Sequence, residues 1–169
     1  SKFLFLIVYF IEVRYEDIAM HINPDHYLQT QQGRIWTKER NQIAWKRCFE
    51  DYLSELRDDA KVQIVYLLIG CQGSGKTHWA AIKNKEEPHN IIFDAILVQK
   101  SERKYLLRLA HIYKKTCIAI YFTTTLKECL YRNSCRNLDE RADEQALTNV
   151  FMYVEKPSLD EGFSSIVQV

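Results

Sequence analysis

The residues of this sequence that most clearly specify a chemistry lie at positions 70–77, which read GCQGSGKT. They fit the phosphate-loop spacing G-x-x-x-x-G-K-[S/T], in which glycines let backbone N–H groups turn toward phosphate oxygens. The motif's lysine reaches the β- and γ-phosphates of a nucleotide, and the hydroxyl that follows it binds Mg²⁺. We therefore expect ATP and Mg²⁺ as cofactors. The predicted nucleotide-binding residues are Gly70, Gln72, Gly73, Ser74, Gly75, Lys76 and Thr77, of which Thr77 is also a predicted magnesium ligand.

The segments around this loop have the types that the motif needs. Residues 62–70, VQIVYLLIG, are apolar on both faces, as a central parallel strand must be, and residues 76–84 begin a predicted helix. The next predicted strand lies within residues 89–98 and ends near Asp94. A carboxylate at the end of a strand beside the loop strand is a candidate magnesium-side group, with a general base or a structural role as the alternatives. The alternative for the loop itself is a glycine turn that binds nothing.

Strands and helices alternate along most of the chain. The predicted strands are 3–13, 18–23, 62–70, 89–98, 117–124 and 164–169. The predicted helices are 37–60, 76–84, 101–115, 126–137 and 143–156, with Thr37 and Ser101 as expected N-caps. This alternation predicts a single α/β domain over residues 1–169, with a parallel sheet covered by helices on both faces.

Composition limits the function classes. Of the 169 residues, 47% are hydrophobic and 27% are charged, which is typical of a soluble globular protein. The formal net charge of only +1 is an argument against a protein whose main function is to bind nucleic acid. Residues 100–136 nevertheless hold nine Lys and Arg against two Glu, either as a basic surface or as a solvated helix face. Five cysteines without a C-x-x-C pair favour reduced thiols in the cytoplasm. The apolar residues 3–11 are too few to span a bilayer, so we expect a buried strand there, with a leader segment as the alternative, and no membrane partner.

Four segments resemble the 5′-hydroxyl polynucleotide kinases of the phage and eukaryotic repair types. The phosphate loop within LLIGCQGSGKTHWA is similar to the phage enzyme's over nearly its whole length. The family's strand ending in Asp and the helix after it resemble HNIIFDAILVQKSERKYLLRLA. A second strand, followed by a helix that reads R-N-x-x-R, resembles YFTTTLKECLYRNSCRN. The family's C-terminal P-T-L-x-E-G-F segment resembles KPSLDEGFSSIVQV. The resemblance covers residues 64–169. It implies a P-loop kinase-type sheet and ATP-dependent phosphorylation of the 5′-hydroxyl end of DNA or RNA.

The resemblance also suggests a general base. The family carries an acceptor-binding Asp in a segment like I-N-R-D-x-x-R, and HINPDHYL places Asp25 at the matching position. The family's following helix resembles residues 37–56 here, but the family has this block after the phosphate loop. We therefore expect a transposed or permuted strand order. Pro24 and Leu28 stand where the family has arginines, the second of which contacts the substrate. Asp25 could alternatively be a turn residue, with Asp94 as the base.

The same resemblance makes Arg136 the expected lid cation over the transferred phosphoryl group, with Arg132 beside it. The two arginines are four residues apart, which places them on one face of a predicted helix. Guanidinium groups pair well with phosphate oxygens. Surface salt bridges are the alternative for both. With Asp25 and Lys76, these arginines complete the predicted catalytic set.

Two other functions fit the same motifs. A small-molecule or nucleoside kinase would use the same loop and lid on a different hydroxyl acceptor. A nucleotide-binding module would retain the loop without transfer, and Leu28 in place of the family's substrate-contacting arginine is compatible with that reading. The expected partners are therefore ATP and either a nucleic-acid 5′ end or a small hydroxyl compound.

Overall fold

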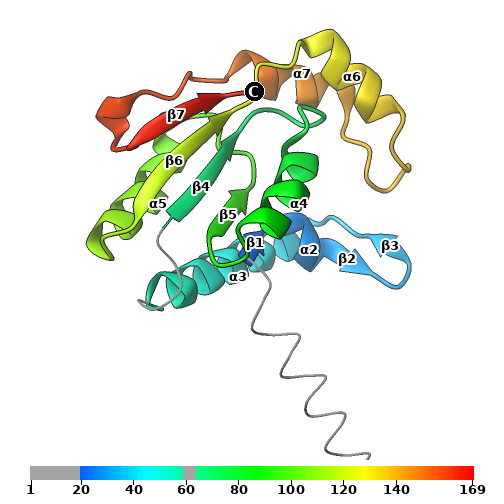
Figure 1. Cartoon of the computed structure of the whole chain (residues 1–169). Helices are drawn as coiled ribbons and strands as arrows, with labels where there is room; N and C mark the ends of the chain where they lie inside the picture. The colour runs from blue at the N-terminus through cyan, green and yellow to red at the C-terminus, as the bar shows by residue number, and fades with distance from the viewer. Residues whose placement is uncertain (1–19, 59–63) are drawn as a thin grey trace, which may run out of the picture.

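The computed structural model describes residues 20–58 and 64–169, so the strand predicted over residues 3–13 lies outside the described residues. Within the described chain, five parallel strands form one sheet in the order β1, β5, β4, β6, β7 (Figure 1). Their bounds are β1 Met20–Ile22, β4 Ile64–Ile69, β5 Ile91–Asp94, β6 Thr116–Tyr121 and β7 Ser165–Gln168. The sequence prediction of a parallel α/β sheet with a non-sequential strand order is confirmed.

Helices cover both faces of this sheet. Helices α3 (Lys38–Leu56) and α5 (Lys100–Ile112) pack on one face, and α4 (Lys76–Glu86) packs on the other. Helices α6 (Leu126–Ser134) and α7 (Glu144–Met152) lie together at the end of the sheet where the strands finish (Figure 1). No helix among the described residues combines the length and apolar character needed to cross a membrane.

The central strand β4 has apolar side chains on both faces of the sheet, so helices must pack on both. Successive side chains of a strand point to opposite faces, and here Val65 and Leu67 join the cluster under α3 and α5, whereas Tyr66 and Leu68 join the cluster under α4. The α3 side is rich in aromatic rings. Tyr52 of α3 packs edge-on against Phe93 of β5 with ring centroids 5.5 Å apart. Cys48, Tyr52 and Leu56 form the face of α3 that is buried in this cluster.

The first described segment of the chain lies at the far edge of the sheet. Strand β1 pairs with β5, and helix α3 then returns the chain to β4 in the middle of the sheet. Between β1 and α3 lie the short helix α2 (Pro24–Leu28) and a hairpin of β2 (Gln29–Thr30) and β3 (Gly33–Arg34). Because all five strands are parallel, the carboxyl ends of β1, β5, β4 and β6 meet at one edge, where ligands bind in open α/β sheets.

One local prediction differs from the structure. Helix α5 begins two residues earlier than expected, because Gln99 rather than Ser101 is its N-cap and forms a capping box with Glu102. Strand β5 ends at Asp94, as predicted, and residues 95–99 form an irregular link to α5. Thr37, by contrast, is the N-cap of α3 as predicted, with its hydroxyl accepting a hydrogen bond from the Arg40 N–H.

The EGF segment at residues 161–163 anchors the C-terminal part of the chain. Arg103 of α5 is fully buried, and its Nε lies 2.7 Å from a carboxylate oxygen of Glu161, while its Nη2 lies 2.9 Å from the other. The remaining Nη1 donates to the carbonyls of Leu97 and Val98. Gly162 ends the turn at φ +111°, and Phe163 is buried in the core. The segment is therefore a packing and turn element.

Replacing Glu161 with alanine should lower the free energy of unfolding by about 3–5 kcal/mol, because it leaves a buried guanidinium without its counter-charge. Urea denaturation measures the change. The matched control is Glu140→Ala, which removes an acidic side chain from the α6–α7 loop and should change stability by about 0.5 kcal/mol or less. Equal effects of the two substitutions would contradict the assigned role of the pair.

Candidate active site

The loop of residues 70–75 joins β4 to α4 at the carboxyl edge of the sheet, in the strand–loop–helix arrangement predicted for it. Gly73 has φ +77°, and a Cβ added there would lie 2.5 Å from the carbonyl oxygen of Cys129 on α6. Gly75 is the N-cap of α4 at φ +104° and supplies no side-chain cap to the helix. The first N–H groups of α4 have no partner within the helix. They therefore remain available to an anion, and the helix dipole favours negative charge at this end.

Lys76 is almost completely buried at the start of α4. Its ammonium donates hydrogen bonds to the carbonyls of Gly70, at 2.8 Å, and Cys71, at 2.9 Å. Burial lowers the pKa of this lysine, and the charge of Arg136 lowers it further, while Asp94 acts in the opposite direction. The cation is thus held against the loop in an environment that disfavours its charge. A phosphate in the loop would relieve that cost by supplying a negative partner.

Asp94 forms the polar centre of the site. Its Oδ2 accepts hydrogen bonds from the Thr77 hydroxyl at 2.9 Å and from the Asn23 side-chain amide at 3.1 Å, and His21 Nε2 lies 3.1 Å from the same oxygen. Burial raises the pKa of this carboxyl, but the His21 hydrogen bond and the Lys76 charge outweigh burial, so that its pKa lies below the usual value. The carboxylate therefore stays ionised at neutral pH. It links the phosphate loop to the end of β1.

The pair Thr77 and Asp94 fits Mg²⁺. This ion is usually held by one or two protein oxygens together with substrate phosphates and waters. A hydroxyl and an ionised carboxylate 2.9 Å apart beside the loop meet that requirement. Within the described residues, no group of three or more His, Cys, Asp or Glu side chains could hold a metal ion. A magnesium ion at this site would therefore depend on the phosphates of a bound nucleotide for further oxygen ligands.

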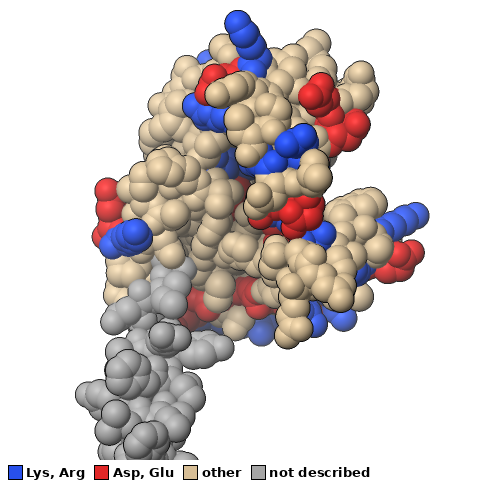
Figure 2. Space-filling view, turned by 90° about the vertical axis from the view of Figure 1, so that its right-hand side faces the viewer, with Lys and Arg blue, Asp and Glu red and all other residues tan. Residues whose placement is uncertain are grey.

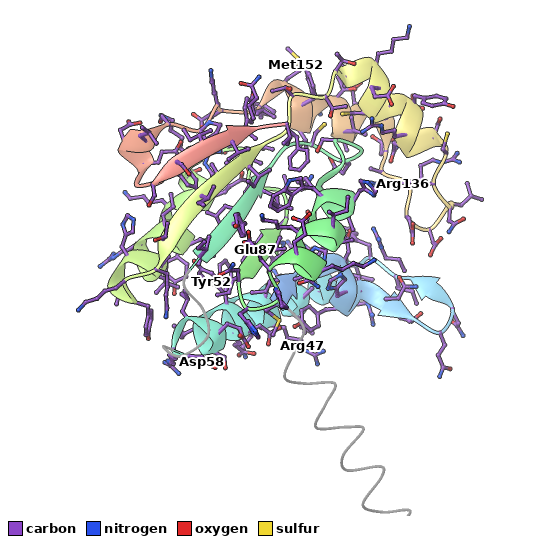
Figure 3. The ribbon with its side chains drawn as sticks, viewed as in Figure 1. Arg47, Tyr52, Asp58, Glu87, Arg136 and Met152 are labelled. Atoms are coloured by element: carbon purple, nitrogen blue, oxygen red, sulfur yellow. The ribbon has the colours of Figure 1, made fainter. Side chains whose placement is uncertain are left out.

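Both predicted lid arginines lie beside the phosphate loop, but they do not share a helix. The Nε of Arg132 on α6 lies 2.7 Å from a carboxylate oxygen of Glu128, and its Nη1 lies 3.5 Å from the Gly73 carbonyl oxygen. Helix α6 ends at Ser134, so Arg136 follows it in the loop, and the predicted common helical face is wrong. Figure 3 shows Arg136 next to α4. Arg132 is thus positioned by α6, and Arg136 by the segment that follows this helix.

The early end of α6 has a local cause. The side chain of Asn133 is buried, and it accepts a hydrogen bond from the Ala142 N–H at 2.9 Å and donates one to the Ala142 carbonyl at 2.8 Å. These bonds turn the chain back on itself and close the loop between α6 and α7. Arg136 sits within this closed loop, where its charge acts on Lys76.

Asp25 lies just after the carboxyl end of β1, in the first turn of α2. Asn23 is the N-cap of that helix, with its side-chain oxygen accepting a hydrogen bond from the Asp25 N–H at 2.9 Å. The amide of the same Asn23 side chain donates to Asp94, so one residue joins the α2 start to the magnesium-side group. The Asp25 carboxylate is partly exposed, and its Oδ2 forms an ion pair with Nη1 of Arg34 at 2.9 Å. Asp25 is thus on the edge of the sheet that carries the loop.

Sequence reasoning missed three polar residues of this site: His21, Asn23 and Arg34. The first two lie about seventy residues before Asp94 in the chain and meet it because β1 pairs with β5. The signal available in the sequence was their place at the end of a short apolar strand. For Arg34 the sequence held no comparable signal, because its position depends on a hairpin of two-residue strands.

A cavity of about 220 Å³ opens beside the loop. Its walls include Ser74 from the loop, Phe122 and Thr124 from the segment after β6, Phe151 from the last turn of α7 and Val154 just after that helix. Within the described residues, the buried Ser74 hydroxyl has no hydrogen-bond partner, and neither has the side-chain oxygen of Gln72. The cavity thus offers aromatic and aliphatic walls with an unsatisfied polar atom next to the phosphate loop.

Charge on the outer face of the site is mixed. Figure 2 looks onto the side that carries the β2–β3 hairpin and α4, and Lys and Arg side chains are interspersed there with Asp and Glu. A broad basic track for a nucleic-acid backbone is not visible on this face of the described chain. Recognition of an acceptor here would depend on individually placed side chains.

No protein-family model matches this chain, and no curated protein matches it significantly. The function must therefore be inferred from the geometry of the site and from the sequence motifs.

Proposed function

We propose that this chain is an ATP-dependent kinase that phosphorylates a hydroxyl group, with the 5′-hydroxyl end of a polynucleotide as the acceptor. The observation that carries the proposal is the contact between the phosphate-loop motif and Asp94 at the carboxyl edge of the sheet. Lys76 is bonded to the loop carbonyls, and the Thr77 hydroxyl donates to Asp94. The polynucleotide acceptor is supported by the four family-like segments and by Asp25, which stands at the matching position in the transposed block.

The proposed roles follow from the positions of the side chains. The loop N–H groups and Lys76 hold the triphosphate, and Thr77 and Asp94 hold Mg²⁺, which supplies positive charge at the phosphates. Arg132 and Arg136 offset the charge on the transferred group. Asp25 orients the acceptor hydroxyl and accepts its proton. The hydroxyl oxygen forms a bond to the γ-phosphorus while the bond to the β–γ bridging oxygen breaks, and ADP leaves with the electron pair.

A small-molecule or nucleoside kinase is the second candidate. The observation that favours it is that no broad basic track for a nucleic acid is visible on the face of the described chain in Figure 2. The mixed charge of the outer face is compatible with a small acceptor as well.

One assay separates the candidates. The chain is incubated with γ-labelled ATP, Mg²⁺ and 5′-hydroxyl DNA or RNA oligonucleotides, and in parallel with nucleosides and small alcohols. Label at the oligonucleotide 5′ end is the expected result. Label on the small compounds alone would favour the second candidate. Nucleotide binding without any transfer would make the chain a binding module and would refute the kinase proposal.

Within this proposal, the cavity beside the loop receives the nucleobase of ATP. Val154→Trp should fill it and weaken ATP binding by about tenfold or more, because a buried base would lose its apolar contacts. Tripolyphosphate, which has no base, should bind the variant as it binds the original protein. Isothermal titration calorimetry measures both ligands.

Met152→Trp is the matched control for this test, since Met152 is the exposed last residue of α7, two residues before Val154 (Figure 3). It should leave both affinities unchanged. Unchanged ATP affinity in Val154→Trp, with tripolyphosphate binding also unchanged, would place the base elsewhere.

A further inference from the structure

We propose that Cys71 of the phosphate loop and Cys129 of α6 form an oxidation site, in which a peroxide closes a disulfide between them and thereby weakens nucleotide binding. The thiol chemistry depends on these two side chains. Its effect on nucleotide binding rests on the proposed function, because that effect assumes that the loop holds the phosphates. All five cysteines of the chain are free thiols in the structure.

The phosphate loop and α6 pack directly against each other at these two cysteines. Cys71 is 2% exposed and Cys129 is fully buried, and both belong to one apolar cluster with Leu147 of α7. The backbones are in contact here as well, since a Cβ added at Gly73 would lie 2.5 Å from the Cys129 carbonyl oxygen. Each thiol is a hydrogen-bonding neighbour of the other. The fold therefore brings together two thiols from distant parts of the chain.

The surroundings make Cys71 the more acidic of the two thiols. The hydrogen bond with Cys129 lowers the pKa of Cys71, burial opposes it, and the charge of Lys76 lowers the pKa further, to about 7. The same hydrogen bond raises the pKa of Cys129, and burial raises it further. Because the thiolate is the nucleophilic and oxidisable form of cysteine, Cys71 is the nucleophile of the pair at neutral pH and Cys129 its protonated partner.

The cavity beside the loop gives a small oxidant access to Cys71. This residue is one of the walls of the 220 Å³ cavity. A water molecule occupies about 30 Å³ of the liquid, so hydrogen peroxide has room to enter. The other two buried cysteines, Cys48 and Cys117, lie in the core under α3 and α5, where burial raises the pKa of each to about 12. They therefore remain protonated and unreactive at neutral pH.

The oxidation has two steps. The Cys71 thiolate attacks hydrogen peroxide, so that a sulfur–oxygen bond forms, the oxygen–oxygen bond breaks, and the departing hydroxide takes up a proton to become water. The Cys129 sulfur then attacks the Cys71 sulfur of this sulfenic acid. A disulfide bond forms, the sulfur–oxygen bond breaks, and the hydroxyl group leaves as a second water with the Cys129 proton. Two thiols thus lose two electrons, and one peroxide is reduced to two waters.

The disulfide should distort the phosphate loop. Its sulfur atoms would lie about 2.05 Å apart, well inside the separation of two sulfurs that are not bonded. The Gly73 backbone already touches the Cys129 carbonyl, so the loop cannot approach α6 without a change in its own conformation. That change would displace the loop N–H groups and the Cys71 carbonyl, which accepts a hydrogen bond from Lys76. Affinity for a nucleotide should therefore fall.

Peptide mass spectrometry of the full chain tests the thiol pair. After treatment with hydrogen peroxide and alkylation of the remaining thiols, a digest should contain a peptide pair that joins Cys71 to Cys129 and that dithiothreitol separates. Cys129→Ser should stop at the sulfenic acid of Cys71, which dimedone labels. Cys135→Ser removes the exposed thiol at the end of α6, and as the matched control it should form the same bridge. A bridge through Cys135, or no bridge, would overturn the inference.

Calorimetry with Mg²⁺ and ADP measures the effect on nucleotide binding. The oxidised protein should bind ADP about tenfold or more weakly than the reduced protein, and dithiothreitol should restore the affinity. An oxidised protein that contains the bridge and binds ADP as tightly as before would overturn the inference. A bridge in a protein whose reduced form binds no nucleotide would instead refute the proposed function, while the oxidation site itself would stand.

Discussion

Lys76→Met should abolish nucleotide binding and phosphoryl transfer while the protein remains folded. The substitution replaces a buried ammonium by an apolar chain of similar length, so it removes the charge with little change in volume. The β- and γ-phosphates would lose their direct cation, and affinity for ATP should fall by about 100-fold or more, as expected for the loss of a buried charge-assisted contact.

Thermal unfolding with and without Mg²⁺ and ADP measures this effect. A ligand that binds the folded state raises the melting temperature, so the original protein should be stabilised by ADP and Lys76→Met should not. Lys85→Met, at an exposed position of the same helix, is the control and should keep the full response. An undiminished response in Lys76→Met would show that the nucleotide binds away from the loop.

The lowered pKa of Lys76 adds a pH dependence. Burial and the Arg136 charge disfavour the protonated form, so this lysine loses its proton at a lower pH than the usual 10.5. Phosphate binding needs the proton. Affinity for nucleotide should therefore begin to fall below pH 10.5 as the solution is made alkaline, before ordinary surface lysines titrate.

The loop and its helix could be predicted from sequence because they depend on neighbouring residues. Gly73 and Gly75 adopt positive φ values that other residues rarely reach, and Lys76 follows them directly at the helix start. The same holds for the apolar strand before them. The spacing of a short segment thus contains nearly all the information that fixes this part of the site.

The rest of the site depends on contacts between distant segments. Asp94 was identifiable as a strand-end carboxylate, but its partners His21 and Asn23 come from an edge strand that the pairing of β1 with β5 brings alongside. The helix predicted over residues 126–137 includes Arg136, yet α6 ends at Ser134, where the side chain of Asn133 bonds to the backbone of Ala142. Periodicity contains no information about such side-chain bonds.

The position of the Asp25 block shows how chain order and spatial order can differ. Strand β1 precedes β4 in the chain but lies two places from it in the sheet, with β5 between them. Parallel strands need long crossover connections in any case, and α3 supplies one here. The block can therefore sit before or after the loop unit in sequence while its strand occupies the same edge. Asn23 and Asp94 mark the point where the two units meet.

Asp25→Asn and Asp94→Asn should have different effects on the reaction. If Asp25 accepts the hydroxyl proton, its amide variant should lower kcat by about 10²- to 10⁴-fold, the usual contribution of a general base, and leave ATP affinity unchanged. Asp94→Asn should instead raise the Mg²⁺ concentration needed for half-maximal rate, because it removes the charge of the group that contacts Thr77. Rates measured across a Mg²⁺ titration distinguish these outcomes.

Stability gives a second readout of the same pair. Asp94 is buried and has three hydrogen-bonding neighbours, and its pKa is lowered in the folded protein. The stability that it contributes is therefore present above the carboxyl's ordinary value of 3.8 and is lost as the pH falls through its lower folded value. Asp94→Asn should remove this part of the acid sensitivity in urea denaturation, whereas Asp25→Asn, at a partly exposed position, should retain it. A kcat loss confined to Asp94→Asn would move the general base from Asp25 to Asp94, since both carboxylates lie at the edge where the loop begins.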